Sequence, residues 1–191
     1  HRAFGTFENI RSGARPLGMS EAFIAVSDDA NAIHYNPAGI FQVRYPEALA
    51  MYVQHFPGLD FGDISSSYIG GIYNFGQAGV FGLSFYRFRV SDPDIFLGYS
   101  ENALTLSFAR TAFNGLLIGG NFKFYLNGFD ISTIDTLNAI SGNYFGSNYD
   151  IKSADIDLAG LYHFKKTIFS FENFRSGVVF ENILGANVGI V

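Results

Sequence analysis

Residues 116–127 read LLIGGNFKFYLN, and residues 153–164 read SADIDLAGLYHF. Apolar and polar side chains alternate in both stretches with a period of two, which is typical of a β-strand with one apolar face. The opposite, polar faces supply the candidates for side chains that line the interior of a barrel: Asn121, Lys123, Tyr125, Asp155, Asp157 and His163.

Alternation in other windows predicts about seven strands in all. It is clear in residues 79–90 and 99–111 and weaker in residues 49–54, whereas residues 65–75 and 176–189 are predicted as strands from composition. In the second window the phase changes at Arg87, which indicates either a β-bulge or an arginine beyond the apolar zone.

The composition narrows the class of protein. Of 191 residues, 48% are hydrophobic, 17% are aromatic and only 15% are charged, which excludes a disordered chain. The net charge of −5 gives no basic field for nucleic acid. Cysteine is absent, which excludes disulfides, cysteine metal sites and a thiol nucleophile. No run of about 20 apolar residues predicts a transmembrane helix.

The predicted connections alternate between short and long. Residues 74–79 and 113–115 form tight turns, whereas residues 56–63, 91–98 and 130–150 form longer polar loops. This asymmetry is typical of a transmembrane β-barrel, whose sheet closes because lipid cannot hydrogen-bond an open edge. We therefore predict an all-β fold, an antiparallel transmembrane β-barrel over residues 46–191. A soluble β-sandwich or lipocalin-like barrel with its apolar face inward remains the alternative.

Residues 12–40 read SGARPLGMSEAFIAVSDDANAIHYNPAGI. This stretch resembles the opening of the FadL/PorV-type outer-membrane β-barrel superfamily, which includes TodX-like and PorQ-like proteins. The chain departs from the pattern at Ser20-Glu21, where the family most often has Gly-Gly, and FENILG at 180–185 is similar to a recurring strand end of PorV-like members. The residues of the motif are Gly13, Arg15, Gly18, Asp28, Asp29, Asn31, Asn36, Pro37 and Gly39.

The resemblance implies that residues 1–45 form a short hatch inside or beneath the barrel. Family barrels have about fourteen strands, so the sequence is expected to be the N-terminal half of a longer protein; a complete chain would favour an eight-stranded barrel. Locally, Ser27 or Asp28 is predicted to cap a short helix through Ala32, and Asn36-Pro37 to end it. Gly39 is predicted to permit the turn into the first strand. Capping and anchoring explain these residue types without a ligand.

The resemblance implies a bacterial outer-membrane protein that passes or binds hydrophobic small molecules. The alternative is a PorV-like partner or shuttle in protein secretion or a surface assembly. The expected partners are outer-membrane lipid, a hydrophobic ligand, and a secreted or surface protein that contacts the long loops; no nucleic acid is expected. No catalytic motif, cofactor site or metal site is predicted, because His34, His55 and His163 are dispersed, and the protein is not expected to be an enzyme.

Overall fold

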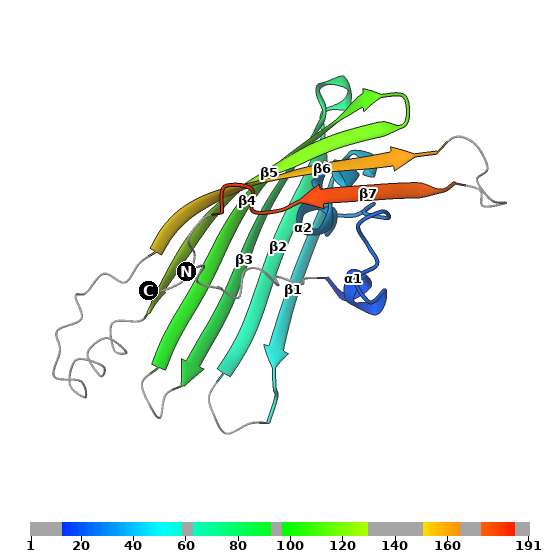
Figure 1. The fold of residues 1–191 in the computed structure, drawn as a ribbon. Helices are drawn as coiled ribbons and strands as arrows, with labels where there is room; N and C mark the ends of the chain where they lie inside the picture. The colour runs from blue at the N-terminus through cyan, green and yellow to red at the C-terminus, as the bar shows by residue number, and fades with distance from the viewer. Residues whose placement is uncertain (1–12, 59–62, 93–96, 130–150, 165–172, 186–191) are drawn as a thin grey trace.

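The computed structural model describes residues 13–58, 63–92, 97–129, 151–164 and 173–185, and it consists mainly of one antiparallel sheet (Figure 1). Three short helices precede the sheet: α1 (Ala14–Gly18), α2 (Ala32–Tyr35) and the 3-10 helix η2 (Pro37–Gln42). The strands are β1 (Glu47–His55), β2 (Asp63–Asn74), β3 (Val80–Asp92), β4 (Leu97–Phe113), β5 (Leu116–Phe129), β6 (Ile151–His163) and β7 (Arg175–Phe180). A 3-10 turn, η3 (Gly76–Ala78), joins β2 to β3.

Each described strand pairs antiparallel with its neighbours in the sequence, in the order β1 to β7, and the sheet curls into a half-barrel. The prediction of an antiparallel all-β fold is confirmed. The two tight turns, Asn114-Gly115 and the η3 turn, lie at the same end of the sheet. We call this end the short-turn end, and the opposite end, at which β1, β3 and β5 finish, the long-loop end.

Of the two interpretations of the phase change at Arg87, the β-bulge is wrong. The register of β3 with both neighbours runs without a shift from Val80 to Ser91, and Arg87 keeps the same face as Phe81 and Phe85. The register shifts instead between Thr111 and Phe113, directly before the β4–β5 turn. The change of phase in the sequence therefore marks a change in side-chain polarity along an unbroken strand.

The two faces of the sheet differ sharply in exposure. On the convex face, Leu83 is 53% exposed and Leu106 is 47% exposed, whereas on the concave face Ser84 and Ser107 are only 2% and 3% exposed. The apolar side chains of these strands thus point outward, and many polar ones point inward.

The N-terminal segment (residues 13–43) lies against the concave face near the short-turn end. Its buried apolar residues form one cluster with β2, β3 and β4, through Ile72, Val80 and Ala109. A second cluster joins Ala38 to β5 and β6 through Leu117 and Leu161. None of the helices in the described ranges is long and apolar enough to cross a membrane.

Candidate functional site

The two halves of the N-terminal motif hold each other together. The Arg15 guanidinium lies 2.6 Å from an Asp28 oxygen and 2.7 Å from an Asp29 oxygen, and both carboxylates raise the pKa of Arg15. Gly13 adopts a positive φ of 95° and lies against Asn31, whose side-chain oxygen would be 2.1 Å from any Cβ at that position. These motif residues bind one another across the segment.

The start of the short helix differs from the prediction. The helix α2 begins at Ala32, so neither Ser27 nor Asp28 caps it. The Ser27 hydroxyl instead donates to the carbonyl of Phe23, and Asp29 Oδ1 accepts from the Asn31 amide at 2.8 Å. This Asx-type turn, which a short acidic side chain can make with the backbone two residues on, leads into the helix.

Asn36 and Pro37 end α2, as predicted. Asn36 is extended, as expected before proline, and its Oδ1 accepts from the Ala38 amide while its Nδ2 donates to the carbonyl of Ile24.

The role predicted for Gly39 is wrong. Gly39 lies within η2, and a Cβ there would come within 2.3 Å of the Ser27 carbonyl oxygen, so close approach of two backbones requires glycine. Gly18 ends α1, and a Cβ there would meet no atom within 4 Å.

The departure at Ser20-Glu21 has a clear conformational meaning. Ser20 has φ of 51° and Glu21 has φ of 65°, which are left-handed conformations that favour glycine. The chain therefore keeps, at some cost in strain, a backbone path for which Gly-Gly is better suited.

Hydrogen bonds fasten the N-terminal segment to strands far apart in the sheet. The Ala30 amide donates to Glu47 on β1 at 3.0 Å, and the carbonyl of Ala30 accepts from the Tyr68 hydroxyl on β2. On the other side, Asn121 on β5 donates to the carbonyl of Ile33, and Arg175 on β7 donates to Gln42. One short segment thus bridges both edges of the described sheet.

Three glycines of the sheet make room for this segment. A Cβ at Gly119 would lie 2.5 Å from the Ala38 amide nitrogen, and one at Gly177 would lie 2.7 Å from the Ile24 carbonyl oxygen. A Cβ at Gly82 would press on the Ile33 side chain. The fit is therefore backbone against backbone at two of the three positions.

The six candidates for interior side chains all lie on the concave face. Five of them, Asn121, Lys123, Tyr125, Asp155 and Asp157, gather on adjacent strands, and the two aspartates are each 1% exposed. His163 lies apart at the short-turn end of β6, opposite Arg175 in the register.

Asp157 is the centre of this cluster. Its carboxylate lies 2.7 Å from Lys123 Nζ and accepts from Asn121 Nδ2 at 2.9 Å and from the Asn182 amide at 3.0 Å. Ser107 donates to Asn121 in turn. Lys123 is itself only 13% exposed, so this is a buried ion pair with several additional hydrogen bonds.

Asp155 holds residues 180–185, which read FENILG, against the edge of β6. Asp155 Oδ1 accepts from the Leu184 amide at 2.9 Å, and Ile183 bonds the Ile156 carbonyl along the edge of β6. The Asp155 and Asp157 carboxylates thus bind the chain that follows β7 to β6. Within this stretch Asn182 has a positive φ of 53°.

His34, His55 and His163 lie apart from one another in the structure. His34 lies in α2 against the Tyr68 ring, and burial together with the Lys123 charge lowers the pKa of His34 to about 3. His55 Nε2 lies 2.8 Å from Ser66 Oγ, which lies 3.1 Å from the Tyr86 hydroxyl. In the parts of the chain that the structure describes, no three His, Asp or Glu side chains could together hold a metal ion.

Sequence reasoning placed Tyr125 on the concave face but missed the two tyrosines that pack with it, Tyr68 and Tyr86. Tyr68, Tyr86 and Tyr125 form a buried cluster, with Met51 and Phe88 packed against it. The signal was weak because polar and aromatic residues share both faces of residues 65–75, so the pattern did not distinguish the faces of β2.

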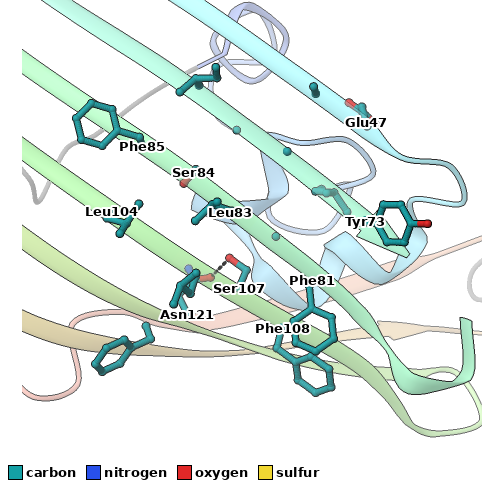
Figure 2. Close-up of a pocket in the computed structure, with 18 of the residues that line it drawn as sticks. Glu47, Tyr73, Phe81, Leu83, Ser84, Phe85, Leu104, Ser107, Phe108 and Asn121 are labelled. Atoms are coloured by element: carbon teal, nitrogen blue, oxygen red, sulfur yellow. Dashed lines mark hydrogen bonds between the residues drawn. The ribbon is translucent and has the colours of Figure 1, made fainter. Parts of the chain in front are cut away.

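The convex face carries a groove of about 940 Å³ over β1 to β5. Figure 2 shows Phe81, Leu83 and Phe85 along it on β3, with Leu104 on one side and Tyr73 on the other. The groove lining is almost wholly apolar, and the small residues Ala48, Gly71 and Gly120 lie among the large ones.

No family model, no curated protein and no solved structure matches this chain.

Proposed function

We propose that the chain forms part of an antiparallel β-barrel in a bacterial outer membrane, and that this barrel binds or passes hydrophobic small molecules. The observation that carries the proposal is the arrangement of polarity across the sheet. Buried ionised groups such as Asp157 and Lys123 lie on the concave face, while Leu106 and Phe124 are about half exposed on the convex face. A soluble sheet protein would normally bury large apolar side chains and expose charged ones.

The size of the apolar zone supports a membrane setting. On the convex face of β4, the apolar residues Leu104, Leu106 and Phe108 lie between the polar residues Asn102 and Arg110. This interval rises about 27 Å along the strand, or about 20 Å after a barrel-like tilt, close to the apolar band of about 25 Å in outer-membrane barrels.

The short-turn end also carries a row of aromatic rings. Tyr73, Phe75, Phe81 and Phe108 contact one another in sequence, with centroid separations of 4.6, 5.4 and 4.9 Å. Aromatic girdles of this kind mark the membrane interfaces of such barrels.

The side chains of the concave face are the argument for a hydrophobic ligand. The N-terminal segment covers it near the short-turn end and contacts Tyr68 through Ala30, and Tyr86 and Tyr125 lie in the same row across the sheet as Tyr68. Aromatic walls with a few hydroxyl groups suit an apolar molecule with a small polar group.

A second candidate function is a scaffold for a secreted or surface protein. The tight fit of the N-terminal segment, with Gly119 and Gly177 against its backbone, favours a closed interior over an open path. A fatty-acid-like molecule recovered from the purified protein would support the first function, and a co-purified protein complex would support the second.

The test of membrane insertion uses two substitutions on the same face of β4. Leu106→Arg lies inside the apolar zone and should cost about 2–4 kcal/mol, whereas Asn102→Arg lies at its edge and should cost at most about 1 kcal/mol. Membrane fractions of a Gram-negative host expressing each variant would be assayed for detergent-dependent extraction. Equal assembly of both variants, or native protein that stays in solution without detergent, would refute the proposal.

A further inference from the structure

The groove on the convex face lies across rows of paired residues. In one row Ile69 pairs with Phe85, which pairs with Leu104, and in the next row Gly71 pairs with Leu83, which pairs with Leu106. Large apolar side chains therefore surround positions at which the sheet presents only backbone.

The space above Gly71 is not required by packing inside the protein. A Cβ at Gly71 would have only the Glu47 carbonyl oxygen within 4 Å, at 3.6 Å, which is ordinary van der Waals contact. By contrast, the glycines beneath the N-terminal segment are needed for the fit described above. The small residue at this position instead leaves part of the groove open on the outer surface.

Two arginines lie just beyond one end of the groove. Arg87 follows Phe85 on the same face of β3, and Arg89 follows Arg87, at successive separations of about 7 Å. Both arginines are exposed, and neither takes part in an ion pair with another described residue. The cross-strand neighbours of Arg87 are Ser67 and Asn102, and those of Arg89 are Ser65 and Ser100, so all four are polar and uncharged.

We propose that this groove holds an acyl chain of an anionic membrane lipid, with the phosphate of the lipid bound by Arg87 and Arg89. The apolar lining suits the hydrocarbon chain, and paired guanidinium groups suit phosphate oxygens at the edge of the apolar zone. The inference rests on the proposed membrane setting, since it requires the convex face to meet lipid.

The experiment measures lipid retention by native mass spectrometry of the detergent-purified protein. The probes are phosphatidylglycerol and phosphatidylcholine with identical acyl chains, added to the same micelles. We expect preferential retention of phosphatidylglycerol, and about tenfold weaker retention of it in Arg87→Gln/Arg89→Gln. Gly71→Leu should reduce retention of both lipids, because its Cβ makes no close contact with the protein and the rest of its side chain occupies the groove.

Arg110→Gln is the matched control, since Arg110 lies on the same face at the opposite edge of the apolar zone. This variant should keep the preference of the native protein. Equal retention of the two lipids, or an unchanged preference in Arg87→Gln/Arg89→Gln, would overturn the inference while leaving the membrane proposal intact. Failure of the membrane proposal is recognised separately, by solubility of the native protein without detergent.

Discussion

Asp157→Asn should destabilise the protein by about 3 kcal/mol. The substitution preserves shape and one acceptor oxygen but removes the charge that faces Lys123 at 2.7 Å. Breaking a buried ion pair by neutralising one partner costs about 3–5 kcal/mol, since the other charge stays in a region of low polarity. We place the value at the lower end because Lys123 is 13% exposed and also lies 3.3 Å from Asn182 Oδ1.

The assay is urea unfolding of the refolded protein in detergent micelles, followed by circular dichroism. Asp63→Asn is the control, because Asp63 is exposed at the start of β2 and its neutralisation should change the free energy of unfolding by less than about 0.5 kcal/mol. The double variant Asp157→Leu/Lys123→Met should lose less than the sum of its two single variants, with a coupling of about 2 kcal/mol. A loss below about 1 kcal/mol for Asp157→Asn, or additive single variants, would refute the assignment of a buried pair.

Three further predictions concern the N-terminal segment. Ser20→Gly should raise the free energy of unfolding by about 0.5–1 kcal/mol, because glycine adopts the left-handed backbone of this position without strain, whereas Ser20→Ala should not raise it. The measurement is the urea midpoint of each variant, and equal midpoints would contradict the prediction. Gly119→Ala should lower the free energy of unfolding by about 1–3 kcal/mol, because its Cβ meets the Ala38 backbone. Gly18→Ala, whose Cβ meets no atom, should leave this free energy unchanged in the same denaturation assay. Similar values for the two variants would show that the close fit is not required. Since the pKa of His34 is lowered to about 3, the unfolded chain takes up a proton that the folded one excludes below about pH 6.5, and stability should fall by about 1.4 kcal/mol per pH unit down to about pH 3. His34→Phe should lose this part of the pH dependence, and parallel pH profiles of the two proteins would argue against it.

The alternation of apolar and polar residues predicted five of the seven strands, and composition predicted the other two, over residues 65–75 and 176–189. In residues 116–127 a period of two fixes which side chains share a face, because a strand places successive side chains on opposite sides. Short turn signals such as Asn114-Gly115 then fix neighbouring strands as antiparallel partners. Local sequence patterns therefore predicted most of the sheet.

The sequence did not predict what the concave side chains bind. The pattern predicted Asp157 only as a side chain that lines the interior, because its partners Lys123 and Asn182 come from another strand and from beyond β7. The role of Gly39 was misread for a similar reason, since its neighbour Ser27 is distant in the pattern and close only in space. Contacts between segments depend on packing, which a periodicity does not encode.

The close fit of α2 and η2 against Gly82 and Gly119 has a consequence for the curvature of the sheet. The backbones of these strands lie in contact with the N-terminal segment and can come no closer to it. The strands therefore bend around this segment. The radius of the half-barrel is then set by the girth of a few residues at its centre as well as by strand twist. A bulkier residue at either glycine would push its strand outward and flatten the wall locally.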